Sequence, residues 1–106
     1  MPNLADLRRD FASHELLESM IANDPFEQFK AWFDDALSSD VIDANAMTVA
    51  TVGPDGKPST RVVLLKAYDQ DGFVFFTNYG SKKGTDLTGN PNAVFHFFWP
   101  RLDRQI

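Results

Sequence analysis

An apolar strand bracketed by two cations, Arg61-Val-Val-Leu-Leu-Lys66, decides the fold of this chain. After one turn it is followed by Phe75-Phe-Thr-Asn-Tyr-Gly-Ser-Lys-Lys83, a strand that ends in a small basic loop. A cation within a strand is costly unless it is paired or hydrogen-bonded. The two stretches together predict a β-sheet protein that holds a flat aromatic ligand carrying a phosphate.

Outward from these stretches, the hydrophobic pattern has a period of two, which is typical of strands. Turn sequences at 53–56 and 69–72 predict that the first three strands form an antiparallel meander. A short helix over 81–87 is expected before the fourth strand, with Ser81 as its N-cap. The predicted strands are 47–52, 57–68, 73–78, 92–99 and a fifth that begins at 102–106.

The first 45 residues have a helical pattern instead. Apolar spacing predicts a helix over 4–21, or two short helices interrupted at 12–14. A second helix is expected to start at Asp24, as N-cap, with Pro25 in the first position, and to end near Ser38. Its apolar face is predicted to pack on the sheet, and consists of Phe26, Phe29, Trp32, Phe33 and Leu37. We therefore expect a helical segment, 1–45, that packs on a barrel formed by 46–106.

Composition excludes several classes of protein. The chain has 106 residues, 43% hydrophobic, a net charge of −5 and no cysteine. The acidic balance argues against nucleic-acid binding, and no apolar run is long enough for a membrane span. The N-terminus lacks the pattern of a secretory signal, and the absence of cysteine fits a cytoplasmic protein. Because residues 46–106 carry seven Lys or Arg against five Asp or Glu, a focused anion site is expected there.

The basic loop is the first candidate for that site. Lys82 and Lys83 follow Ser81 and Thr77 at a strand-to-helix junction, where free N–H groups and the helix dipole attract phosphate. The alternative is that the two lysines are simply solvated. Arg61 and Lys66 lie an odd number of residues apart, so a regular strand points them to opposite faces. Both can contact one ligand if the strand bulges or the ligand lies along its edge.

Other catalytic chemistry has little support in the sequence. There is no cysteine nucleophile, and His14 and His96 are too few for a histidine-based metal site. No metal site is predicted. Redox chemistry would therefore come from a bound organic cofactor.

At these residues the chain resembles the pyridoxamine/pyridoxine 5′-phosphate oxidase family, which has an FMN-binding split-barrel fold. The matching elements occur in family order and include Asp24-Pro25, Arg61 to Lys66, Phe76-Thr-Asn78 with Gly80-Ser81 and Lys83, Asn90-Pro91 and Arg104-Gln105. The resemblance implies a mainly β protein with N-terminal helices and an antiparallel split β-barrel, incomplete in this chain. It covers roughly the first half of a usual family member.

The resemblance also implies an activity and a site. The activity is the oxidation of pyridoxamine or pyridoxine 5′-phosphate to pyridoxal 5′-phosphate by a homodimeric flavoenzyme that uses FMN and O2. The residues implied to bind FMN are Arg61, Val62, Val63, Leu64, Leu65, Lys66, Phe76, Thr77, Ser81, Lys82, Lys83 and Gln105, with Gln105 reaching across the dimer. The residues implied to bind substrate are Lys66 and the N-terminal Arg8, Arg9, Asp10 and Phe11.

The chain departs from the family pattern at a few positions. Family members often have tyrosine where Phe76 and Phe11 stand, and arginine where Lys82 stands. Lysine keeps the charge but loses the bidentate geometry of arginine. Two other readings stay open: a non-catalytic FMN-binding or dimerisation module of the same fold, and an α+β packing fragment without a ligand.

Overall fold

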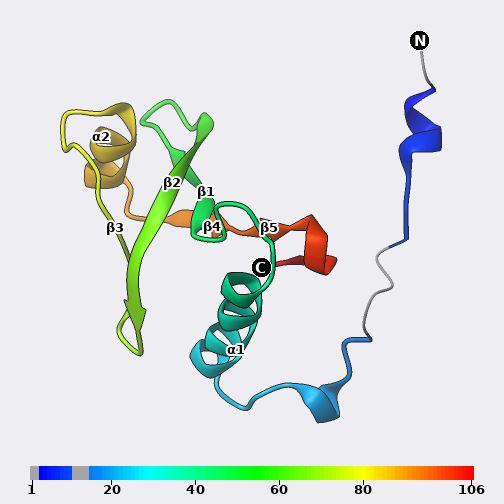
Figure 1. The fold of residues 1–106 in the computed structure, drawn as a ribbon. Helices are drawn as coiled ribbons and strands as arrows, with labels where there is room; N and C mark the ends of the chain where they lie inside the picture. The colour runs from blue at the N-terminus through cyan, green and yellow to red at the C-terminus, as the bar shows by residue number, and fades with distance from the viewer. Residues whose placement is uncertain (1–2, 11–14) are drawn as a thin grey trace.

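The computed structural model describes residues 3–10 and 15–106. The strands form a four-stranded antiparallel sheet in the order β3-β2-β1-β4, and a separate two-stranded hairpin, β5-β6 (Figure 1). The elements in chain order are η1 (Leu4–Leu7), η2 (Glu18–Met20), α1 (Pro25–Ser38), β1 (Ala46–Val52), β2 (Pro58–Asp69), β3 (Gly72–Phe75), α2 (Lys82–Gly89), β4 (Ala93–His96), β5 (Phe98–Trp99), η3 (Pro100–Leu102) and β6 (Arg104–Gln105).

The antiparallel meander predicted for the first three strands is confirmed, with β1 paired to β2 from Ala46–Leu64 to Val52–Pro58. The third strand ends at Phe75 rather than at Asn78, because the basic loop begins there. The fourth predicted strand is divided in two at Phe97. This fully buried residue pairs its backbone with Ile106, at 2.9 and 3.0 Å, so the chain leaves β1 and joins a new partner.

Helix α1 begins as the sequence predicts. The Asp24 side chain accepts a hydrogen bond from Phe26 N at 3.0 Å, and Pro25 occupies the first helical position. Phe29 and Phe33 are buried, which confirms that this aromatic face packs on the sheet. Leu37 is the exception, since it is 59% exposed on the solvent side of the last turn.

Phe29 is at the centre of the core. Its ring lies 4.8 Å from the ring of Phe73 and 5.0 Å from that of Tyr68, both edge to face, and 5.2 Å from that of Phe97. Edge-to-face contacts of this kind add to the stabilisation that comes from burial alone. The core therefore joins α1 to β2, β3 and the residue between β4 and β5.

A single helix over 4–21 is wrong for the residues that the structure describes there, and the alternative of two short helices is closer to what forms. Only two short 3-10 turns form, η1 and η2, and neither has a buried residue. Leu4, Leu7 and Leu16 are 75%, 66% and 73% exposed. Short helices are marginal unless an apolar face packs on other residues, and η1 and η2 lie outside the core (Figure 1).

The four-stranded sheet curls and has two different faces. Its inner face carries Met47, Val49 and Leu65, which α1 covers. Its outer face carries Val62, Leu64 and Val94, which are 67%, 44% and 65% exposed. Within the described residues, no helix is long and apolar enough to cross a bilayer.

Candidate anion-binding site

Arg61 lies on the inner face of β2, at the margin of the buried cluster. In the β1–β2 register it stands opposite Val49, and Ser59 stands opposite Thr51. Its Nη1 donates to the Val49 carbonyl at 3.1 Å and to Thr51 Oγ1 at 2.8 Å, and its Nη2 donates to Ser59 Oγ at 2.8 Å. This end of the inner face is therefore polar, and Arg61 is held there by three acceptors.

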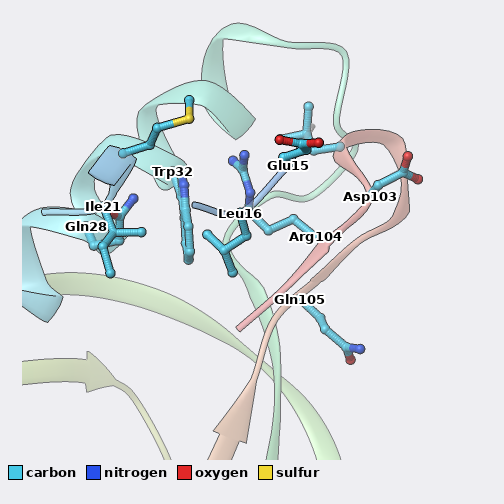
Figure 2. A pocket seen from close by; sticks show the side chains of 10 residues that line it. Glu15, Leu16, Ile21, Gln28, Trp32, Asp103, Arg104 and Gln105 are labelled. Atoms are coloured by element: carbon cyan, nitrogen blue, oxygen red, sulfur yellow. The ribbon is translucent and has the colours of Figure 1, made fainter. Parts of the chain in front are cut away.

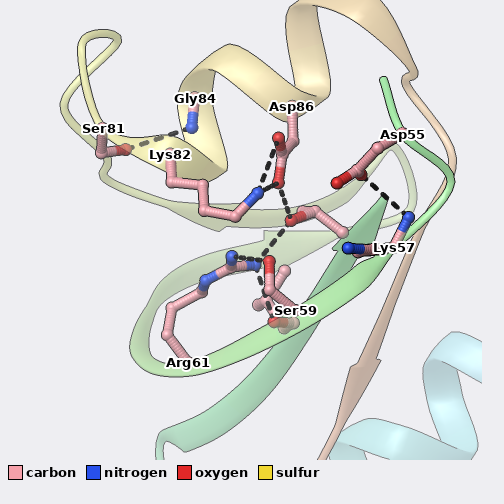
Figure 3. A network of polar contacts seen from close by, with 10 residues as sticks. Asp55, Lys57, Ser59, Arg61, Ser81, Lys82, Gly84 and Asp86 are labelled. Atoms are coloured by element: carbon pink, nitrogen blue, oxygen red, sulfur yellow. Dashed lines mark hydrogen bonds and ion pairs between the residues drawn. The ribbon is translucent and has the colours of Figure 1, made fainter. Parts of the chain in front are cut away.

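Helix α2 covers this polar end and contributes Lys82 and Asp86 (Figure 3). Thr51 Oγ1 donates to Asp86 Oδ2 at 3.0 Å, and Lys82 Nζ lies 3.2 Å from the same oxygen. The side chain of Asp86 is 3% exposed, whereas that of Lys82 is 62% exposed. The network thus connects the cation of β2 to the first cation of α2 through a buried hydroxyl and a buried carboxylate.

The network keeps Asp86 ionised. Burial raises the pKa of this carboxyl, but hydrogen bonds from Lys82 and Thr51 and the charges of Lys82 and Arg61 outweigh it. The net result is a pKa below the ordinary value of 3.8. Asp86 is therefore an anion at neutral pH, in the middle of three cationic or hydroxyl groups.

Lys83 belongs to a second group, at the junction of the basic loop and α2. Its Nζ donates to Thr77 Oγ1 and, at 3.4 Å, to Ser81 Oγ. Ser81 is the N-cap of α2, as predicted, and accepts from Gly84 N at 3.1 Å. The structure thus brings Thr77, Ser81 and Lys83 together, one residue along from the Lys82–Asp86 pair.

Lys66 lies in an irregularity of β2. The β2–β3 register shifts between Leu65 and Ala67, which is a bulge or a related irregularity of the strand. Lys66 is exposed and five residues from Arg61, about 16 Å along an extended strand. None of the described contacts joins the two cations, and a ligand that reaches both must span that length.

The apolar residues assigned to the site divide between the two faces. Val63 and Leu65 point inward with Arg61, and Leu65 is buried in the core. Val62 and Leu64 point outward, and Phe76 is 74% exposed. Because the side chains alternate, one ligand can meet this strand on one face or along its backbone.

Gln105 lies on the β5–β6 hairpin, which Figure 1 places well away from α2. Its Oε1 is 2.7 Å from His96 Nε2. Gln105 also borders a cavity of about 360 Å³ between the hairpin, α1 and the segment before it, with Trp32 and Arg104 (Figure 2). Arg104 lies 4.8 Å from the ring centre of Trp32, and its Nη1 is 3.6 Å from Asp35 Oδ2.

Of the N-terminal residues assigned to substrate, Arg9 contacts this hairpin. Arg9 pairs with Asp103, and its Nη2 donates to the Pro100 carbonyl at 2.9 Å. Arg8 and Asp10 are exposed, and Phe11 lies outside the described residues. The structure therefore connects Arg61 with Lys82, and separately Arg9 with the hairpin, but not these two groups with each other.

Three residues of the site were missed by sequence reasoning, although each had a signal. Thr51 is a polar residue at a position that the period of two marks as buried, after Met47 and Val49. Ser59 shares the face of Arg61 because it is two residues away. Asp86 follows Lys82 at the i,i+4 spacing of a helical ion pair. Among the residues that the structure describes, no cluster of His, Cys, Asp or Glu is able to hold a metal ion.

Comparison with known sequences places these residues in a family. The family profile described as pyridoxamine 5′-phosphate oxidase matches residues 16–106. A pyridoxine/pyridoxamine 5′-phosphate oxidase of Cupriavidus metallidurans is 55% identical over 106 residues, all of this chain and 50% of that protein. The protein of the same name from Thermosynechococcus vestitus is 53% identical over the same length. The chain spans about half the length of these curated relatives.

Solved structures match the fold. PhzG from Burkholderia lata 383, in complex with tetrahydrophenazine-1-carboxylic acid, has a TM-score of 0.80 and 28% identity over 86% of this chain and 46% of that one. A pyridoxamine 5′-phosphate oxidase-related, FMN-binding protein from Nostoc punctiforme has a TM-score of 0.62 and 24% identity, over 73% and 41%. The predicted split-barrel fold is confirmed, with part of the barrel in this chain.

Proposed function

The chain belongs to the pyridoxamine 5′-phosphate oxidase family, and from that premise we propose that it binds FMN and serves the oxidation of pyridoxamine or pyridoxine 5′-phosphate to pyridoxal 5′-phosphate, with O2 as acceptor. The observation that supports this most is the group of cations and hydroxyls at the polar end of the inner face. Arg61 and Lys82 meet there through Thr51 and Asp86, and Lys83 follows on the same helix.

The donor chemistry of this end fits a phosphate. A phosphate monoester carries close to two negative charges at neutral pH and accepts several hydrogen bonds. Arg61, Lys82 and Lys83 carry three positive charges against the one negative charge of Asp86, which leaves two. The hydroxyls of Thr77 and Ser81 add donors beside Lys83. We assign the phosphate of FMN to this set of side chains.

The remaining assignments follow the same proposal. The strand from Val62 to Lys66, with Phe76, would line the flavin, and Lys66 would approach the phosphate of the substrate. Bound FMN would supply the redox chemistry of this oxidation. Arg8 to Phe11 would contact the substrate from the N-terminal segment.

We also propose that the protein is a homodimer, in which Gln105 reaches the cofactor of the partner. The outer face of the sheet supports this, because Val62, Leu64 and Val94 form an exposed apolar surface there. Exposed apolar surfaces of this kind often mark interfaces. Sedimentation equilibrium at several protein concentrations would measure the mass, and a monomer at every concentration would contradict the dimer. A cytoplasmic location stays a prediction from the sequence.

The experiment for the main proposal separates binding from catalysis. The purified chain is titrated into FMN and the quenching of flavin fluorescence is followed, with riboflavin, which lacks the phosphate, as the matched ligand. FMN is expected to bind at least tenfold more tightly than riboflavin, since charge-assisted hydrogen bonds to the phosphate are lost with riboflavin. Peroxide release on addition of pyridoxine 5′-phosphate then tests the oxidation. FMN binding without peroxide leaves the cofactor assignment standing and contradicts turnover by this chain.

A further inference from the structure

The hydroxyl of Thr51 is fully buried, and it lies between two charged groups from different elements. It accepts from Arg61 Nη1 at 2.8 Å and donates to Asp86 Oδ2 at 3.0 Å, and Figure 3 labels these two partners. A threonine hydroxyl has one hydrogen, so it donates to one partner at a time. Because the carboxylate of Asp86 only accepts, the hydrogen of Thr51 points to Asp86, and its lone pairs are left facing Arg61.

The same bond decides how Arg61 is oriented. Each Nη of a guanidinium carries two hydrogens. Both hydrogens of Nη1 are used, one by the Val49 carbonyl and one by Thr51, and Nη2 gives one to Ser59. These three bonds leave Nε–H and one hydrogen of Nη2 as donors for a ligand. The direction of those donors therefore depends on the acceptors that hold the rest of the group.

Thr51 also connects this cation to helix α2. The oxygen of Asp86 that accepts from Thr51 is the one that lies 3.2 Å from Lys82 Nζ. Thr51 itself is on β1, the central strand of the three, where it pairs with β2 on one side and β4 on the other. A buried hydroxyl on a rigid strand thus fixes a cation of β2 relative to a cation of α2.

We propose that Thr51 is a positioning residue of the phosphate site: its hydroxyl aligns Arg61 with the Asp86–Lys82 pair for the phosphate of a flavin nucleotide. The inference rests on the proposed function, and it adds a specific role for a residue that does not itself contact the ligand. A misaligned guanidinium keeps its charge but loses the geometry that bidentate phosphate recognition needs.

The test uses two variants. Thr51→Val keeps the shape of the side chain and removes the hydroxyl, whereas Thr51→Ser keeps the hydroxyl and removes the methyl group. Dissociation constants for FMN and for riboflavin are measured for both variants and the wild type. Thr51→Val is expected to weaken the binding of FMN about tenfold and that of riboflavin less than about twofold, because only FMN has the phosphate. Thr51→Ser is expected to stay within about threefold of the wild type for both ligands.

A double-mutant cycle with Arg61→Met then identifies the route of the effect. In the Arg61→Met background, Thr51→Val is expected to change the FMN constant less than twofold, because the group that Thr51 positions is absent. An undiminished tenfold effect in that background would overturn the proposal. Equal loss of FMN and riboflavin in Thr51→Val would also overturn it, because that is the result of a general structural defect.

Two further outcomes are distinguishable. If the wild type binds FMN and Thr51→Val binds it equally well, this inference fails and the proposed function stands. If the wild type does not bind FMN, both fail. If Thr51→Val does not fold, the proposal is tested on the wild type without ligand, by nuclear magnetic resonance. We then expect the Nη protons of Arg61 to give resolved, slowly exchanging signals. A single averaged guanidinium signal would overturn the proposal.

Discussion

Gly84 of helix α2 packs directly on Asn78 of the basic loop: a Cβ added at Gly84 would lie 2.7 Å from the Asn78 carbonyl oxygen. It would also lie 2.8 Å from the Tyr79 carbonyl oxygen. Both contacts are with backbone atoms, which cannot swing aside as the end of a side chain does. The close approach holds the loop with Thr77 and Ser81 against the helix that carries Lys82 and Lys83.

Gly84→Ala is therefore expected to lower the free energy of unfolding by about 1–3 kcal/mol, through overpacking and a shift of the loop. Gly89→Ala is the matched control on the same helix, since a Cβ there would have no atom within 4 Å apart from its chain neighbours and its own helix backbone. It should leave stability unchanged or raise it by up to about 1 kcal/mol, because alanine favours helix. Urea unfolding followed by circular dichroism measures both. Equal stability of the two variants would contradict the packing argument.

The core offers a similar comparison within α1. Phe29→Ala removes a buried ring that contacts Phe73, Tyr68 and Phe97, and is expected to cost about 3–5 kcal/mol. Leu37→Ala, on the exposed side of the same helix, should change the free energy of unfolding by less than about 0.5 kcal/mol. Thermal or urea unfolding measures the free energy of unfolding of both variants. A loss at Leu37 as large as that at Phe29 would mean that the outer side of α1 is covered in solution.

The comparison of Phe29 and Leu37 also shows what the sequence predicts well. Periodicity and capping identified α1, its start at Asp24 and its buried face, since these depend on local signals. The strands of the meander followed from turn residues at 53–56 and 69–72. Leu37 is exposed although its neighbour Ala36 is fully buried, so the buried stripe of α1 is narrower than the apolar stripe of its sequence. That width depends on tertiary packing, which no local pattern specifies.

Other features depend on tertiary contacts. The division of the fourth strand at Phe97 is determined by where Ile106 returns to pair with it. The helical spacing of Leu4, Leu7 and Leu16 predicted a helix, but these side chains stay mostly exposed. In the site, Arg61 and the two lysines were predicted from residue type. Thr51 and Asp86 could not be predicted in this way, because they contact each other only when α2 packs on β1.

The cations of the site are expected to act mainly on the phosphate. Arg61→Ala and Lys83→Ala should each weaken the binding of FMN about 10- to 100-fold, which is the range for hydrogen bonds to charged groups. The binding of riboflavin should weaken far less. Lys30→Ala is the control, since Lys30 pairs with Asp34 on the exposed side of α1. Its FMN constant should match the wild type. Fluorescence quenching measures all three, and an unchanged FMN constant for both Arg61→Ala and Lys83→Ala would remove the phosphate assignment.

The last prediction concerns the pH dependence of stability. The pKa of Asp86 is below its ordinary value of 3.8 in the folded chain, despite its burial, because Lys82, Thr51 and Arg61 favour the carboxylate. A carboxyl with a lowered folded pKa stabilises the fold above its unfolded pKa, and this stabilisation is lost as the pH falls through the folded value. Asp86→Asn should therefore destabilise the chain by a constant amount between about pH 5 and pH 8, well above the ordinary pKa of an aspartate. Below about pH 4 the destabilisation should become progressively smaller. Asp40→Asn is the control, because the Asp40–Arg101 pair is exposed and contributes little. Urea unfolding at each pH measures the difference from the wild type. A difference for Asp86→Asn that does not diminish in acid would mean that its charge does not stabilise the network.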